Sequence, residues 1–298
     1  MRVAEQAMPR CPLCGADRTN SRFRHGTYTI FACRACRGGF AWPRLRPGEL
    51  EGVYDEGYAD SYISGAMHEV GFAQGRFRQL EKSLQGCSVD LSKGVGRRVL
   101  DVGCGSGQFA REFLRRGWLA EGVEISPLLA GEAKSSGLTV HVGDFLRLEL
   151  SKSLYDLITM FHVIEHFDAA SEAATKCHSL LRPSGVLVLE TPNWRGIGAL
   201  LRGSRWSHII PPEHLNYFGP AALSRLVLRA GFSGASAVTV TPQVIQAAEG
   251  APRWAQRVVR GVYQLATLLG IGTTLQVFAF KNDRSGRSDA QRAQREPR

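Results

Sequence analysis

Two histidines and a glutamate stand close together in HVIEHF, where His162, Glu165 and His166 fall within five residues. The run just before them, YDLITMF (155–161), is apolar and predicts a buried strand. Polar side chains that directly follow such a strand should stand at the mouth of a site. A histidine can accept a proton near neutral pH, so this segment is a candidate for acid–base chemistry.

A second polar segment lies downstream in IIPPEHLNYF (209–218), which carries Glu213 and His214 between two prolines and two aromatic residues. The prolines restrict the backbone, which favours a rigid loop folded over a pocket. We expect His166 and His214 to face the pocket mouth from opposite sides. One of them would act as the base, with Glu165 beside it.

Four cysteines form two C-x2-C pairs near the N-terminus, Cys11 with Cys14 and Cys33 with Cys36. Four thiolates at this spacing are typical of a tetrahedral structural zinc site with no open position. The segment between the pairs has the alternating character of a short hairpin. A segment this small has too little core to fold alone, so metal binding would supply the missing stability. A redox pair or an iron site is the alternative.

From residue 97 the sequence alternates expected strands and helices, which is the pattern of a parallel sheet covered by helices. The first strand ends in VLDVGCGSGQF, with Gly103, Gly105 and Gly107 in the turn. A glycine-rich turn of this kind allows close approach of a ligand to the backbone, but dinucleotide-binding folds use a similar one.

Three acidic residues make the cofactor assignment more specific. Asp101 lies inside the first strand, and Glu124 ends the second strand, where a carboxylate can accept both hydroxyl groups of a ribose. Asp144 ends the third strand, where it can accept a hydrogen bond from an adenine amino group. Together they predict a nucleoside-containing cofactor across the carboxyl ends of the strands.

These motifs, with YDLITMFHVIEHF and LLRPSGVLVLETPN, resemble the class I S-adenosylmethionine (SAM)-dependent methyltransferases. The resemblance implies a Rossmann-like α/β fold with a seven-stranded sheet, its last strand antiparallel, preceded here by a small zinc ribbon. The HLNYF loop resembles methyltransferases of sugar, lipid and secondary-metabolite pathways. The implied cofactor-binding residues are Asp101, Gly103, Gly105, Gly107, Glu124, Ile125, Asp144, Phe145, Phe161 and His162.

The pattern ExxEH with a distant histidine also resembles the divalent-metal site of small-RNA 2′-O-methyltransferases and ubiquinone-pathway O-methyltransferases. Glu165, His166 and His214 match that pattern, but His162 replaces its first acid. Magnesium prefers oxygen ligands, so this replacement favours a metal-free histidine base. A divalent cation at the active site stays open as the alternative.

The expected organisation has four parts. They are a zinc ribbon (1–45), a helical linker or lid (46–96), the methyltransferase domain (97–281) with a helical insert (243–273), and a disordered basic tail (282–298). In the linker, Tyr54, Tyr58 and Tyr62 recur at helical spacing, which favours packing over a role above a ligand.

The insert contains a stretch whose apolar residues fall on one helical face, with arginines nearby. One reading is a helix packed on the domain or on a partner in a homodimer. The other is a surface helix, 252–269, in peripheral contact with a membrane or a lipid-linked substrate. The uncharged stretch 261–280 contains GIGTT, so we expect a helix end, a turn and a strand there, and no membrane span.

The net charge of +10 is concentrated at the two ends of the chain. Residues 1–50 carry nine arginines against three acidic residues, and residues 281–298 carry six basic against three acidic residues. The long middle part is nearly neutral, so a nucleic-acid partner is not required. The N-terminus has no apolar signal region, and paired cysteines suit a reducing compartment, so we expect a cytoplasmic protein.

These observations predict an enzyme that transfers a methyl group from SAM to a small-molecule acceptor, with a hydroxyl oxygen favoured. The first alternative is an RNA methyltransferase that uses the basic ribbon to bind phosphates. The ribbon lacks the exposed aromatic residues that stack on bases, which argues against it. The second is a non-catalytic SAM-binding protein, but the intact glycine turn, Glu124 and Asp144 argue against decay of the site.

Overall fold

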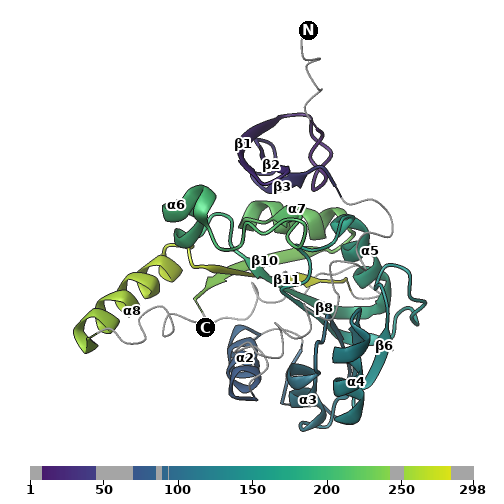
Figure 1. Cartoon of the computed structure of the whole chain (residues 1–298). Coiled ribbons are helices and arrows are strands. Elements are labelled where there is room, and N and C mark those ends of the chain that lie inside the picture. The colour runs from purple at the N-terminus through teal and green to yellow at the C-terminus, as the bar shows by residue number, and fades with distance from the viewer. Residues whose placement is uncertain (1–8, 45–69, 85–88, 93, 242–251, 283–298) are drawn as a thin grey trace, which may run out of the picture.

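The protein was analysed as a computed structural model, which describes residues 9–44, 70–84, 89–92, 94–241 and 252–282. Its centre is a seven-stranded sheet in the order β10-β11-β8-β7-β4-β5-β6 (Figure 1). The strands are β4 (Arg98–Val102), β5 (Leu119–Glu124), β6 (Thr139–Val142), β7 (Tyr155–Phe161), β8 (Leu181–Pro192), β10 (Gly234–Val240) and β11 (Thr274–Phe280).

The strands β4 to β8 pair in parallel, whereas β11 is antiparallel to both β8 and β10. The predicted seven-stranded sheet with an antiparallel last strand is therefore confirmed. Every residue of β7 is buried, because helices cover both faces of the sheet at its centre. The carboxyl ends of β4, β5 and β7 meet at one edge, which is where the polar segments of the sequence begin.

Helices form a layer on each face of the sheet (Figure 1). On one face lie α2 (Val70–Ser83), α3 (Gln108–Leu114) and α4 (Pro127–Ser135). On the other lie α5 (Ala170–Leu180) and α7 (Pro220–Arg229). Two separate hydrophobic cores result, one beneath each layer, with Phe77 and Phe113 in the first and Leu223 and Leu226 in the second.

A second, antiparallel sheet has the order β1-β2-β3-β9. The expected hairpin between the cysteine pairs is β1 (Thr19–His25) and β2 (Tyr28–Cys33), and β3 (Gly39–Trp42) follows it. The fourth strand, β9 (Asn216–Tyr217), comes from the HLNYF loop and pairs with Gly39 and Phe40 of β3. The N-terminal hairpin and the loop that carries His214 are thus joined in one sheet.

The N-terminal sheet packs against α7 (Figure 1). Cys11, Cys33 and Cys36 share a hydrophobic core with Leu223 of α7, and Arg229 of the same helix donates to the carbonyl oxygen of Cys14 at 2.7 Å. Burial and hydrogen bonds therefore hold this part of the chain against α7.

Arg44 connects the end of the N-terminal sheet to both polar segments. Its guanidinium donates to the Asp168 carboxylate at 2.6 Å, to the Asp168 carbonyl at 2.7 Å, and to the carbonyl of Leu215 and the side chain of Asn216 at 2.9 and 3.2 Å. Only 12% of the Arg44 side chain is exposed. One side chain therefore holds the residues after HVIEHF against the HLNYF loop.

Between β8 and β9 the chain forms α6 (Ile197–Arg202) and the short 3-10 helix η3 (Gly203–Arg205), which the sequence analysis did not anticipate. The expected insert contains α8 (Arg253–Leu268). The stretch 261–280 is a helix end, a turn and the strand β11, as predicted. Among the described residues, no helix combines the length and the apolarity needed to cross a bilayer.

Several predictions from the sequence lie outside the described residues. They include the tyrosine pattern at Tyr54, Tyr58 and Tyr62, most of the tail 282–298, and the start of the insert. The proposed boundary at residue 45 falls next to a described strand whose sheet continues into the HLNYF loop.

Replacing Arg44 with Ala should lower the free energy of unfolding by about 2–3 kcal/mol, because it removes a largely buried guanidinium that donates hydrogen bonds to Asp168, Leu215 and Asn216. Urea denaturation measures this loss. The matched control is Arg24→Ala on exposed β1, which should change the value by less than about 0.5 kcal/mol. Equal stability of the two variants would show that Arg44 does not hold these segments together.

Candidate active site

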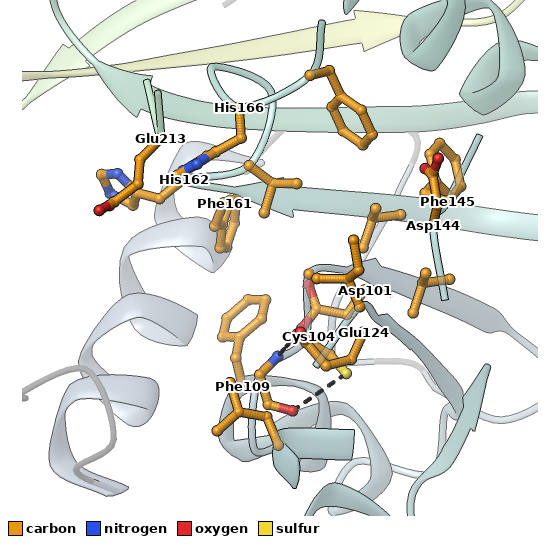
Figure 2. A pocket seen from close by; sticks show the side chains of 18 of the residues that line it. Asp101, Cys104, Phe109, Glu124, Asp144, Phe145, Phe161, His162, His166 and Glu213 are labelled. Atoms are coloured by element: carbon orange, nitrogen blue, oxygen red, sulfur yellow. Dashed lines mark hydrogen bonds between the residues drawn. The ribbon is translucent and has the colours of Figure 1, made fainter. Parts of the chain in front are cut away.

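The described part of the chain contains a cavity of about 310 Å³ at the carboxyl ends of the central strands (Figure 2). All but two of the residues predicted to bind a cofactor or to act in catalysis line it. They are Asp101, Gly103, Gly105, Glu124, Ile125, Asp144, Phe145, Phe161, His162, His166 and His214. Gly107 lies outside the lining, and Glu165 is buried behind it.

Glu124 ends β5 at the base of the pocket and is 5% exposed. One carboxylate oxygen accepts a hydrogen bond from Gly105 N–H at 2.8 Å, and the other accepts from Ser126 N–H at 2.9 Å. Burial raises the pKa of Glu124, and these N–H groups oppose that shift. Each oxygen keeps a second lone pair, so the fixed carboxylate can accept two further hydrogen bonds from a ligand.

The backbone conformation of this turn and the residues packed against it both require glycine. Gly103, Gly105 and Gly107 all have positive φ, at +71°, +54° and +79°. A Cβ at Gly103 would lie 2.3 Å from Val163 Cγ2, and one at Gly107 would lie 3.0 Å from the Cβ of Ala133 in α4. Gly103 therefore allows the HVIEHF segment to approach the turn, whereas Gly107 allows packing between helices.

Asp101 and Asp144 stand on either side of the β5 end (Figure 2). Asp101 is 4% exposed and accepts a hydrogen bond from Thr159 at 2.7 Å. Burial raises its pKa to about 7, although the Thr159 hydrogen bond opposes the shift. Asp144 accepts from Leu146 N–H at 2.9 Å, which fixes the carboxylate at the end of β6.

His162 ends β7 in a left-handed conformation, with φ of +56°, which is costly for a residue other than glycine. Its N–H donates to the Glu190 carbonyl at 2.8 Å, and its ring lies 3.2 Å from the Glu190 carboxylate and 3.6 Å from that of Glu165. Burial would lower the pKa of His162, but the two carboxylates outweigh it and raise the value to about 9. The raised pKa favours the protonated form of this partly exposed side chain at neutral pH.

Glu165, His166 and His214 form a cluster in which the three ligand atoms lie within 4.8 Å of one another. The rings of His166 and His214 are neighbours, 4.8 Å apart and nearly perpendicular. Our expectation that they face the mouth from opposite sides is therefore wrong. The backbone explains the difference, because the carbonyl oxygen of Glu165 accepts from the N–H groups of Leu215 and Asn216, both at 3.0 Å.

Burial and the neighbouring charges shift the pKa values of this cluster. Burial opposes ionisation of Glu165, but His162 outweighs it and lowers the Glu165 pKa to about 2. Both carboxylate oxygens are buried without a hydrogen-bond partner in the described part of the chain. Burial lowers the pKa of His166, and it lowers that of His214 to about 3. Two neutral imidazoles thus stand beside one ionised carboxylate.

His208, which the sequence analysis did not single out, orients His214. The His214 Nδ1 lies 3.0 Å from the His208 carbonyl oxygen, which can only accept, so Nδ1 carries the proton. Nε2 is then the basic nitrogen of His214. The two rings are stacked at 5.8 Å, and burial lowers the pKa of His208 to about 4.

Glu190, whose carboxylate faces His162, is held by residues from elements far apart in the sequence. Arg76 of α2 donates to one oxygen of Glu190 at 2.9 Å, and Gln276 of β11 donates to the other at 2.6 Å. Glu190 is 1% exposed. The only local indication of such a role was a charged residue at the end of an apolar strand, in VLVLETP.

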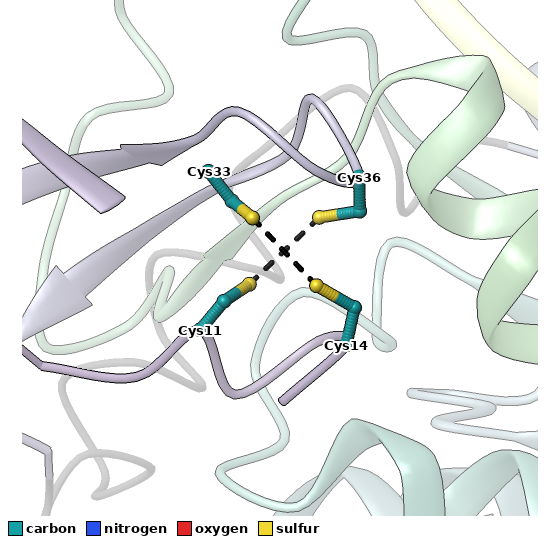
Figure 3. A group of neighbouring side chains, drawn as sticks. All are labelled: Cys11, Cys14, Cys33 and Cys36. Carbon is teal, nitrogen blue, oxygen red and sulfur yellow. Dashed lines mark hydrogen bonds between the residues drawn. The ribbon is translucent and has the colours of Figure 1, made fainter. Parts of the chain in front are cut away.

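The four cysteines of the N-terminal pairs point at a common centre (Figure 3). Cys11 Sγ lies 3.8 Å from Cys36 Sγ, and Cys14 Sγ lies 3.6 Å from Cys33 Sγ. A tetrahedron with metal–sulfur bonds of about 2.3 Å has edges of about 3.8 Å. The four thiols could therefore hold one ion of that size.

The sequence profile described as "Methyltransferase domain" matches residues 72–237. Proteins named ubiquinone biosynthesis O-methyltransferase are 28% identical over 144 residues in Rhodopseudomonas palustris and 32% identical over 109 residues in Haemophilus ducreyi. These matches cover 41% and 33% of this chain, and 57% and 46% of those relatives. The chain thus matches only about half the length of these curated relatives.

The fold is shared with the crystal structure of a SAM-dependent methyltransferase from Archaeoglobus fulgidus. That structure has a TM-score of 0.54 and 21% sequence identity, and the alignment covers 76% of this chain and all of that one. The seven-stranded sheet, the pocket at its carboxyl edge and the profile match over more than half of the sequence agree, and the chain belongs to the methyltransferase-domain family.

Proposed function

We propose that this protein transfers the methyl group of SAM to a hydroxyl oxygen of a small-molecule acceptor, in the class of sugar, lipid-linked or secondary-metabolite intermediates. The observation that carries the proposal is the pair of neutral imidazoles, His166 and His214, at the mouth of a pocket whose base holds Glu124. The name of the relatives, which are O-methyltransferases, supports oxygen as the acceptor atom.

The pocket fits the chemistry of SAM. Glu124 offers two oriented acceptors for the ribose hydroxyl groups, and Asp144 with the apolar wall of Ile125 and Phe145 suits an adenine ring. Asp101 is a buried carboxylate, and a nearby ligand cation would stabilise its ionised form. When bound, SAM supplies an electrophilic methyl carbon on a sulfonium.

The residues of this chain would then bind the acceptor and accept its proton. The ring of His166, or Nε2 of His214, would take the proton from the acceptor hydroxyl, and His166 is favoured because burial weakens His214 strongly as a base. The acceptor oxygen forms its bond to the methyl carbon as the carbon–sulfur bond breaks. Ionised Glu165 stabilises the imidazolium that results, because the two groups share a buried site.

A second mechanism is favoured by the same cluster. Glu165 has two buried oxygens without hydrogen-bond partners in the described chain, and with His166 and His214 it offers three ligand atoms within 4.8 Å. A divalent cation held there would lower the pKa of an acceptor hydroxyl. His162 is not one of the three residues whose ligand atoms lie this close together.

We also propose that Cys11, Cys14, Cys33 and Cys36 bind structural zinc. The Cys11–Cys36 and Cys14–Cys33 sulfur–sulfur distances fit the edge of a zinc–thiolate tetrahedron, and three of the four cysteines are buried. Four reduced thiolates suit a reducing compartment, which supports a cytoplasmic protein.

Glu124→Gln should weaken binding of S-adenosylhomocysteine by about 10- to 100-fold, because it removes charge-assisted hydrogen bonds. Isothermal titration calorimetry measures the affinity. The matched control is Glu121→Gln, on the same strand but outside the pocket lining, which should bind as the parent does. Unchanged affinity in Glu124→Gln would remove Glu124 from the cofactor site.

His166→Ala and His214→Ala should each lower turnover by roughly 10²–10⁴ with little change in cofactor affinity, since each removes a candidate base. Turnover is followed with methyl-labelled SAM and a panel of hydroxylated acceptors. His25→Ala, at the exposed end of β1, is the control. Near-parental turnover in both active-site variants would exclude a histidine base.

The same assay separates the two mechanisms. If a metal is used, EDTA abolishes turnover and an added divalent cation restores it, and Glu165→Gln weakens binding of Mn²⁺ in calorimetry. If the histidine acts alone, EDTA leaves turnover unchanged.

Purified protein should contain about one zinc per chain, and Cys11→Ser with Cys14→Ser should lose it. Because β3 pairs with the HLNYF loop, this variant should also lose methyl transfer, whereas Glu124 stays in place. Metal analysis and calorimetry with S-adenosylhomocysteine measure the two effects. Cys177→Ser, in the core beneath α5, should keep its zinc. Full zinc in the double variant would contradict the four-thiolate site.

A further inference from the structure

Helix α8 exposes an apolar face to solvent. It extends away from the sheet on the same side as α6 (Figure 1), and of its described side chains only Ala266 is buried. Trp254 is 70% exposed and Leu268 is 84% exposed. Apolar side chains recur along the helix at the spacing of one face and continue just past its end, at Trp254, Val258, Val262, Leu265 and Leu269.

Helix α6 begins beside the C-terminal end of α8 and also exposes apolar side chains. The two helices are tied at their ends, because Ile197 N–H donates to the carbonyl of Ile271 at 2.8 Å, just beyond α8. Leu200 and Leu201 of α6 are 55% and 80% exposed. We call this combined surface, formed by α6 and α8, the α6–α8 face. Contiguous exposed apolar side chains of this kind mark an interaction site.

The charge around the α6–α8 face has one sign. Residues 194–212 contain three arginines, residues 252–273 contain three arginines, and neither segment contains an aspartate or a glutamate. The described side chains of Arg202, Arg205, Arg253 and Arg257 are exposed. An amphipathic helix with a tryptophan and leucines on one face and arginines beside them is typical of binding to an anionic lipid surface.

We propose that the α6–α8 face docks on an anionic lipid surface. A second copy of this chain is the competing occupant, since exposed apolar helices often pair. In a two-fold dimer, however, the same patch meets itself, so the arginines of each copy would face those of the other with no acidic partner in either segment. Anionic headgroups supply the missing charge.

The position of the α6–α8 face relative to the pocket connects lipid docking with the binding of the acceptor. This step rests on the proposed function. The loop that follows α6 carries His208 and Ile210, both of which line the cavity. A surface docked through α6 therefore lies beside the pocket mouth. An acceptor with a lipid tail could stay in the lipid layer while its head enters the pocket.

Co-sedimentation with vesicles tests the docking without methyl transfer. The full chain should bind vesicles that contain phosphatidylglycerol, bind phosphatidylcholine vesicles far more weakly, and lose affinity as salt rises. Arg253→Glu with Arg257→Glu should weaken binding about 30-fold or more. Leu265→Glu should weaken it through the apolar face. The matched control, Leu128→Glu with Lys134→Glu on α4, should bind as the parent does.

The fluorescence of Trp254 gives a second readout. Anionic vesicles should shift the emission of the parent to shorter wavelength, and Trp254→Phe should lose most of that shift. Thermal melting checks that each variant is folded. Equal binding to both vesicle types, or none to either, would overturn the proposal. So would a doubled mass in light scattering without vesicles that Leu265→Glu abolishes, because it would assign the face to a second copy.

Discussion

The carbonyl oxygen of Glu165 accepts two hydrogen bonds from the HLNYF loop, and the arrangement of the site depends on this contact. Glu165 follows β7, and the donors Leu215 and Asn216 lie some fifty residues later in the sequence. The contact brings His166 and His214 to the same point. The loop is also held by pairing between β3 and β9, and by a hydrogen bond from Arg44 to the carbonyl oxygen of Leu215. Without these two backbone hydrogen bonds, His166 and His214 would not be held next to each other.

The buried charges around His162 set a pH window for this arrangement. The pKa of His162 is raised from 6.5 to about 9, so its stabilising contribution is complete below pH 6.5 and is lost as the pH rises through 9. The pKa values of Glu165 and Glu190 are lowered from 4.5 to about 2, so their contribution is present above pH 4.5 and is lost as the pH falls toward 2. All three groups favour the folded state between these limits.

Most of the fold could be predicted from the sequence, because its signals are local. Alternating apolar strands, the glycine turn and acids at strand ends predict a parallel sheet with a cofactor edge, and the pocket contains Glu124 and Asp144 as expected. The paired cysteines likewise predict their own cluster. Each of these patterns needs only a few neighbouring residues to be interpreted.

The missed features depend on contacts between distant segments. Gln276 and Arg76 meet at Glu190 although they lie on β11 and α2. His208 stands in a loop without a recognisable pattern and acts through its backbone carbonyl. The charge of His162 also follows from this assembly, since its position after β7 suggested only contact with a cofactor. A pattern of neighbouring residues in the sequence does not predict contacts between segments that are far apart in it.

The pairing of β3 with β9 has a consequence for how the chain can be divided. A protein shortened to begin at α2 would retain the whole seven-stranded sheet, yet β9 would lose its neighbour and become a free edge. The same cut would uncover the part of α7 that meets the N-terminal segment, where Ala222 lies against Gly38. A free strand edge beside newly exposed apolar surface promotes aggregation, so we expect the first forty residues to cover the methyltransferase domain and limit its self-association.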